Sequence, residues 1–280
     1  MKKFTPPEKF EPHRLAGGAF AHLNQIFKLN EQTDWPSFNW LNSLVDTQNH
    51  QAKPIEFVSD AELQDETRYY EQIIYETGQV PTREQNWHDL FGAMIWSLFP
   101  KSKSLLNKRH IDEINEHGLK RRSKHRNALT LFDECGVIIA MTDEAFSLKL
   151  KAHQWQDVFV DSRTRWGHDI KPFIFGHANY EMLTKPFIGL TGKVLCVVVD
   201  ECFFSLDLTN QYDALDACLV DMIQNEGVLD DNSALSPLPL LGVPTWCDDN
   251  QDPEYYNNTD YFRPKRRNTH DRSQGATKAL

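Results

Sequence analysis

The sequence places histidine and carboxylate side chains together in several short stretches. His88 and Asp89 are adjacent at the expected start of a helix, where they could ligate a metal or act as an acid–base pair. Asp89 also has a local explanation. If Asn86 is the N-cap, Asp89 occupies the third helical position, where a carboxylate suits the helix dipole. His88 then lies on the flank of the apolar stripe. Two interpretations remain: a functional site that contains His88 and Asp89, or a helix cap in which Asp89 has only a structural role.

The segment from Lys120 to Glu134 carries its charges in an order that a helix dipole disfavours. Basic residues come first and Asp133 and Glu134 last, at a cost of only about 0.3 to 1 kcal/mol for each charge. The acidic end could bind a metal or an arginine, and the basic start an anion or an acidic protein surface. The alternative is a solvated face whose carboxylates bond Arg109 or Arg126. The candidate anion-binding residues are Arg121, Arg122, Lys124 and Arg126.

Two further histidines complete the set of candidates. A helical spacing of four would put His177 and Glu181 on one face, as two ligands of one metal or as a histidine bonded to a carboxylate. His110 stands four residues from both Leu106 and Ile114 and therefore faces an apolar side, where a core histidine is the commoner finding. The metal-ligand candidates are His88, Asp89, His110, His177 and Glu181, and the catalytic candidates are His88, Asp133 and Glu134.

Composition narrows the class of protein. The 280 residues include 40% hydrophobic and 25% charged residues, which is ordinary for a globular protein. A formal charge of −10 disfavours general DNA binding. The longest strongly apolar run, residues 194–199, is far too short for a membrane span, and no secretory signal is evident. Five cysteines without a CxxC pair indicate reduced thiols and a cytoplasmic protein.

The elements expected to position these residues are mostly helices. A capping box at Ser59 and a stop at Gly78 predict one helix between them. Apolar periodicity predicts others over residues 87–98, 104–117, 123–135, 144–155, 173–185 and 209–225. Strands are expected at 137–140 and 193–199. The fold class is therefore α+β, predominantly helical, with a small number of short strands.

The expected organisation is one globular domain over residues 1–265. It includes an irregular N-terminal arm at 1–35 and an extended C-terminal arm at 237–265 that packs on the rest. The polar segment 266–280 is expected to be disordered.

Six short strings are specific in combination: Val80–Arg83, Asn86–Phe91, Ala128–Glu134, Phe175–Ala178, Leu241–Pro244 and Phe262–Pro264. Together they resemble a bacterial family known as Domain of Unknown Function 3025, over roughly residues 35 to 265. The resemblance implies no activity or cofactor, but the recurring strings contain His88, Asp89, Asp133, Glu134 and His177. This chain carries threonine after Pro244 where the family pattern has glycine, which puts a tight turn there in doubt.

Three hypotheses follow for function. The first is a metal-dependent, hydrolase-like enzyme in which a divalent metal activates water and Glu134 or Asp133 is the base. It needs at least four of seven side chains to converge: His88, Asp89, His110, Asp133, Glu134, His177 and Glu181. The second is a non-catalytic module that binds an anionic ligand, RNA or an acidic protein through residues 120–126, with Arg263, Arg266 and Arg267 nearby. The third is a buried polar network that only fixes helix register.

Overall fold

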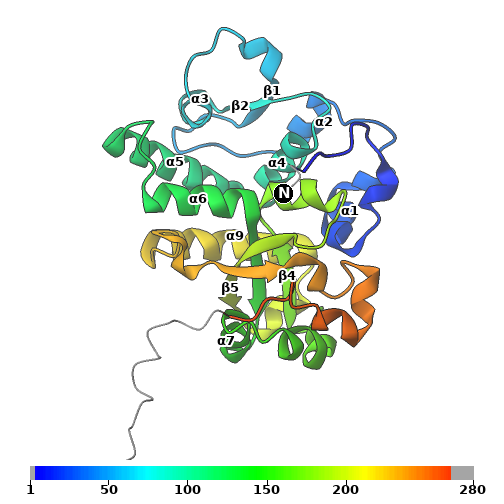
Figure 1. Cartoon of the computed structure of the whole chain (residues 1–280). Helices are drawn as coiled ribbons and strands as arrows, with labels where there is room; N and C mark the ends of the chain where they lie inside the picture. The colour runs from blue at the N-terminus through cyan, green and yellow to red at the C-terminus, as the bar shows by residue number, and fades with distance from the viewer. Residues whose placement is uncertain (1–3, 266–280) are drawn as a thin grey trace, which may run out of the picture.

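The computed structural model describes residues 4–265, and Figure 1 shows the predicted α+β, predominantly helical fold. Its larger sheet has the order β4-β3-β5-β6, with β3 (Gly136–Met141) parallel to β5 (Thr191–Val198) and antiparallel to β4 (Ile170–Ile174). The edge strand β6 (Ser236–Pro239) is antiparallel to β5. Every residue of β3 is buried, which explains its continuous apolar sequence.

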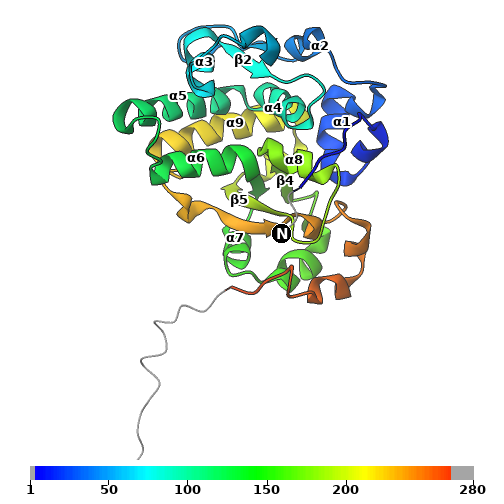
Figure 2. The same cartoon turned by 45° about the horizontal axis from the view of Figure 1, so that its top comes forward.

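Helices cover both sides of this sheet. Figures 1 and 2 show α4 (Trp87–Leu98), α5 (Pro100–His117), α6 (Lys124–Cys135) and α9 (Leu208–Asn225) grouped on one side and α7 (Glu144–Lys151) on the other. None of the helices in residues 4–265 has the length and apolar character needed to cross a membrane.

A second, two-stranded sheet lies beyond α4 and α5. Its strands β1 (Glu56–Ser59) and β2 (Gln79–Thr82) are parallel, and α3 (Tyr70–Thr77) supplies the crossover that a parallel pair requires. The prediction of a helix that starts at Ser59 is wrong, because Ser59 is the last residue of β1 and its side chain makes no capping hydrogen bond. The expected stop at Gly78 is confirmed, with φ at 81°.

Local signals located other helix ends correctly. The side chains of Asn86 and Ser123 accept hydrogen bonds from the N–H groups of Asp89 and Arg126, three residues on, and so cap α4 and α6. Pro100 ends α4 as expected, but it also begins α5.

Two other helices are shorter than predicted. Residues 173–185 do not form one helix, because Phe173 and Ile174 pair with β3 as the end of β4 and only α8 (His177–Leu183) is helical. The helix expected over residues 144–155 is the shorter α7, followed by a π-helical turn at Asp157–Asp161.

Both terminal arms contain short helical elements. The N-terminal arm contains a helix, α1 (Ala21–Phe27), and α2 (Phe38–Ser43) follows it. Apart from β6, the described part of the C-terminal arm contains three 3-10 turns, and its buried Phe262 packs on the core. The tail at 266–280 lies outside the described residues.

The turn after Pro244 persists without glycine. The N–H of Trp246 donates to the carbonyl of Val243 at 3.1 Å. Thr245 takes φ at 73°, a left-handed conformation that glycine adopts far more readily.

The N-terminus of α5 is capped from a different helix. The N–H groups of Lys101 and Ser102 donate to the carboxylate of Asp216 in α9, at 2.9 and 2.8 Å. Asp216 is 1% exposed, and burial raises the pKa of its carboxyl group against the opposing effect of these hydrogen bonds. The contact fastens α5, which forms part of the cavity described below, to α9.

Replacing Asp216 with alanine is expected to lower the free energy of unfolding by about 2 to 3 kcal/mol, because two N–H groups lose a charged acceptor. Urea denaturation at pH 7 measures this loss. The control Asp213→Ala changes the same charge on an exposed part of α9 and should stay within about 0.5 kcal/mol of wild type. Equal losses in the two variants would contradict the capping role.

Candidate metal centre

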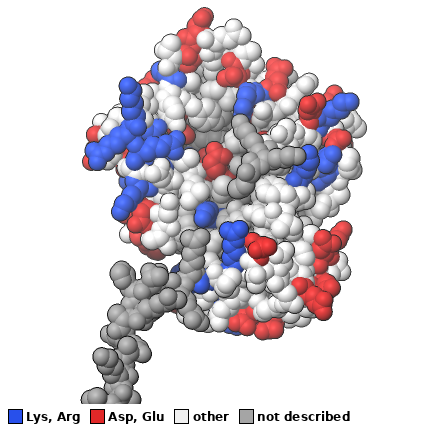
Figure 3. Space-filling view, in the orientation of Figure 1, with Lys and Arg blue, Asp and Glu red and all other residues white. Residues whose placement is uncertain are grey.

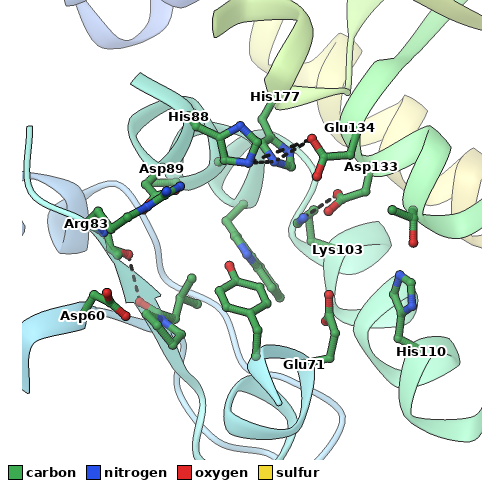
Figure 4. A pocket seen from close by; sticks show the side chains of 18 of the residues that line it. Asp60, Glu71, Arg83, His88, Asp89, Lys103, His110, Asp133, Glu134 and His177 are labelled. Atoms are coloured by element: carbon green, nitrogen blue, oxygen red, sulfur yellow. Dashed lines mark hydrogen bonds and ion pairs between the residues drawn. The ribbon is translucent and has the colours of Figure 1, made fainter. Parts of the chain in front are cut away.

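Three side chains from three helices point toward one another at one end of a cavity (Figure 4). His88 comes from the first turn of α4, Glu134 from the last turn of α6, and His177 is the first residue of α8. The two histidine Nε2 atoms are 2.9 Å apart. Glu134 Oε2 lies 3.9 Å from Nε2 of His88 and 3.6 Å from Nε2 of His177. Each residue therefore offers one ligand atom to a common centre.

The size of this triangle suits a transition-metal ion. A circle through corners 2.9, 3.6 and 3.9 Å apart has a radius of about 2.0 Å, which matches zinc–nitrogen and zinc–oxygen distances of about 2.0 to 2.2 Å. Two imidazole nitrogens 2.9 Å apart need a shared proton or a shared cation between them. The geometry of His88, His177 and Glu134 therefore fits a common cation.

Glu181 contacts the outer side of this cluster. Its Oε2 atom lies 3.2 Å from Nδ1 of His88 and accepts the proton there. That hydrogen bond leaves Nε2 of a neutral His88 unprotonated and aimed at the cluster. Carboxylate–histidine pairs of this kind orient metal-bound histidines and raise their basicity.

Two glycines explain how Glu134 and His177 come to be adjacent. The backbone passes from α6 directly into β3 at Gly136, and the N–H groups of Phe175 and Gly176 donate to the carbonyl of Gly136 at 3.0 and 2.8 Å. A Cβ atom on Gly176 would stand 2.4 to 2.5 Å from backbone atoms of residues 134–136. The absence of a side chain at Gly176 therefore lets His177 lie against the end of α6.

A buried ion pair adjoins the cluster. Lys103 Nζ in α5 lies 2.5 Å from Asp133 Oδ1 and 5.5 Å from the ring centre of Trp96. Burial disfavours ionisation of Asp133, but the charge of Lys103 and the hydrogen bond from Lys103 lower its pKa. Asp133 is therefore an ionised carboxylate beside the three ligand atoms.

The pKa values of the three side chains in the cluster are shifted in different directions. Burial lowers the pKa of His177 to about 3, so this ring is neutral at pH 7. Burial also raises the pKa of Glu134. At His88, burial opposes protonation, but the hydrogen bond to Glu181 and the charge of Glu134 raise the pKa overall.

The cavity beside the cluster has a volume of about 510 Å³, within the range of ligand sites. Helices α4, α5 and α6 border it on one side and the β1–β2 unit on the other. Tyr70 and Trp96 provide aromatic surface, and Tyr70 is 44% exposed. The charged residues and histidines that line it are Asp60, Glu71, Arg83, His88, Asp89, Lys103, His110, Arg122, Asp133, Glu134 and His177.

Three of the seven predicted side chains thus converge as potential ligands, one fewer than the hypothesis required. Asp133 and Glu181 lie next to them. Asp89 lines the cavity but is occupied, because the side chain of Arg83 binds both of its oxygens at 2.8 and 2.9 Å. His110 lines the cavity away from the cluster (Figure 4).

The four basic candidates are spread over different environments. Arg121 and Lys124 are exposed, Arg122 lines the cavity, and Arg126 is buried at 3% exposure. Figure 3 shows lysine and arginine side chains gathered at the left edge, over the turn between α5 and α6. Arg263 lies far along the chain, and its side chain donates to the carbonyl of Asp260.

Sequence reasoning missed several residues of this region. Lys103 carried no signal, because its partner Asp133 is 30 residues away. Arg83 stood within a family string but had no assigned role. The glycine at position 176 also stood in such a string, beside His177, and its spacing to Gly136 could not be read without the fold.

The chain has a predominantly helical α+β fold, and a cluster of two histidines and one glutamate lies beside a cavity. Its residues 55–266 match the family described as Protein of unknown function (DUF3025), and the chain belongs to that family. No curated protein and no solved structure matches the chain.

Proposed function

We propose that this protein is a metal-dependent hydrolase whose ion is held by His88, Glu134 and His177. The observation that carries the proposal is the convergence of three ligand atoms, all within 4.8 Å of one another, at the edge of a 510 Å³ cavity. A histidine–carboxylate cluster with only a structural role does not need such a cavity.

The ligand set favours zinc or another divalent transition metal. Imidazole nitrogens suit zinc, whereas calcium and magnesium prefer oxygen ligands throughout. Three protein ligands are also the number typical of catalytic zinc sites, which keep a further position for water or substrate. The ion would supply Lewis acidity and activate water near neutral pH.

The remaining side chains have separate roles in this proposal. Glu181 holds His88 with Nε2 toward the ion. Asp133 is the general base, because it lines the cavity next to Glu134 and only its Oδ1 atom is paired with Lys103. Lys103 keeps Asp133 ionised and adds positive charge where negative charge develops during hydrolysis.

We also place the protein in a reducing, cytoplasm-like compartment. All five cysteines are free, and Cys202 is exposed. Free thiols persist where glutathione and thioredoxin keep them reduced.

Elemental analysis of protein purified without chelators or an affinity metal tests the proposal. One equivalent of zinc or a similar ion is expected, with hydrolysis of at least one member of a panel of chromogenic esters, amides and phosphoesters. Activity should disappear on chelation and return with the ion. Metal-free protein that binds no added zinc, cobalt, manganese or nickel would rule the proposal out.

Glu181→Ala is expected to weaken metal affinity by about 10- to 100-fold, the usual effect of removing a partner that orients a metal-bound histidine. Competition with a fluorescent zinc chelator measures the change. Glu181→Gln keeps an acceptor for Nδ1 of His88 and should lose less. Glu116→Ala, 73% exposed in α5, is the control for loss of a carboxylate and should bind as wild type does. Unchanged metal affinity in Glu181→Ala would show that Glu181 does not orient His88 for metal binding.

A further inference from the structure

Arg126 is an arginine buried without a carboxylate partner. It is 3% exposed, and no Asp or Glu among residues 4–265 lies within ion-pair distance of it. Its guanidinium donates to the carbonyl of Leu119 at 2.9 Å and lies 5.3 Å from the ring centre of Tyr69, but its Nε atom is buried with no hydrogen-bond partner. Buried charges in proteins are normally paired, because the desolvation penalty is otherwise uncompensated.

A second unsatisfied donor lies nearby. His110 is 6% exposed and lines the cavity, yet its Nδ1 atom has no hydrogen-bond partner. Burial lowers the pKa of His110, and the positive charge of Arg126 lowers it further, while Glu71 and Asp133 oppose both effects. A neutral imidazole can still donate one hydrogen bond into the cavity.

The same end of the cavity has an exposed cation at its rim. Arg122 lines the cavity and makes one long contact, at 3.5 Å, with the hydroxyl of Thr130. Glu71, a carboxylate that also lines the cavity, accepts from Nδ2 of Asn107 at 2.7 Å and forms no ion pair within residues 4–265. Arg122 therefore lines the cavity without an ion-pair partner among residues 4–265, and Arg126, which does not line the cavity, contributes its charge from behind the wall next to His110.

The contacts between α5 and α6 fix the distance from this end to the candidate metal centre. Lys103 pairs with Asp133, and Glu113 further along α5 accepts from Ser123 and His125 near the start of α6, so the two helices run antiparallel. The guanidinium of Arg122 lies beside Thr130, four residues before Glu134 on α6, a rise of about 6 Å. One cavity thus contacts both the candidate metal centre and the side chains of Arg122 and His110.

We propose that this cationic end, formed by Arg122, His110 and the charge of Arg126, binds an anionic group of the substrate, a phosphate or a carboxylate. The inference rests on the proposed function only in treating the bound anion as part of a substrate. The substrate class would be a hydrolysable compound that carries its anionic group roughly one to two helical turns, about 6 to 12 Å, from the bond that is cleaved.

Titration of chelator-treated, metal-free protein with inorganic phosphate, and separately with malonate, tests the site without any need for activity. Isothermal titration calorimetry should detect saturable binding of at least one of the two, and the tighter ligand identifies the anion. Arg122→Gln should weaken that binding about tenfold or more, since a hydrogen bond to a charged group is lost. Lys120→Gln removes an equal charge from an exposed position in the same turn and should leave the binding unchanged.

Arg126→Met gives an independent measurement. The melting temperature of ligand-free protein should stay the same or rise, because an uncompensated buried charge is removed. Phosphate or malonate should then raise the melting temperature of wild type by more than that of Arg126→Met. Absence of anion binding in wild type, or equal weakening by Lys120→Gln and Arg122→Gln, would overturn the inference. Anion binding that survives in a His177→Ala variant unable to hold metal would support the inference even if the proposed hydrolase is wrong.

Discussion

Replacing His177 with alanine is expected to abolish stoichiometric metal binding and hydrolysis while the protein stays folded. The variant loses one of three ligands, so metal affinity should fall by more than the roughly 100-fold that loss of an orienting partner can cause. Elemental analysis and competition with a zinc chelator measure the loss, and circular dichroism verifies the fold. His168→Ala, at an exposed position, is the control for loss of an imidazole and should keep its metal.

The same variant separates the metal hypothesis from a purely structural network. His177 is 8% exposed, so its truncation removes packing as well as a ligand, and some loss of stability is expected in either case. A structural network predicts that added zinc leaves the melting temperature of wild type unchanged, and likewise that of His177→Ala. A metal centre predicts that zinc raises the melting temperature of wild type only, because a ligand that binds the folded state stabilises it. If zinc stabilises the two proteins equally, the three-ligand centre is wrong.

Much of the fold could be predicted because its signals are local. Asn86 and Ser123 cap helices, Gly78 and Gly118 end them, and each acts within a few residues of its own position. Errors arose where a distant partner decides the structure. Phe173 lies in an apolar stretch that fits a helix, but in the structure it belongs to β4, which pairs with β3 in an antiparallel arrangement.

In the candidate site, too, local signals were predictable and contacts between distant residues were not. Residue types identified His88, Glu134 and His177 as potential ligands, and helix capping gave a local reason to doubt Asp89, whose carboxylate is paired with Arg83. The other interactions of the site could not be predicted, because the interacting residues lie far apart in the sequence. The pair of Lys103 with Asp133 spans 30 residues. The unsatisfied atoms of Arg126 and His110 become visible only once every neighbour is in place, because the lack of a partner is not a property of sequence spacing.

Gly176→Ala is expected to damage the fold and the candidate metal centre together. A methyl group at this position would stand 2.4 Å from the backbone nitrogen of Gly136 and 2.5 Å from the carbonyl oxygen of Glu134. Backbone atoms at a helix-to-strand junction cannot rotate away as a side chain can, so α8 must move off the end of α6. The free energy of unfolding should fall by about 3 kcal/mol, the upper part of the range for overpacked cores.

The displacement also gives a result that instability alone would not. His177 follows Gly176 directly, so its Nε2 atom should move away from Glu134, and zinc affinity should fall at temperatures where the variant is still fully folded. Urea denaturation and chelator competition at 10 °C measure the two effects separately. Gly17→Ala is the matched control, because a Cβ atom there would meet nothing within 4 Å and the backbone φ of −69° accepts any residue. A Gly176→Ala protein that is destabilised but binds zinc as wild type does would show that the contact between α6 and α8 holds the fold without setting the distance between Glu134 and His177.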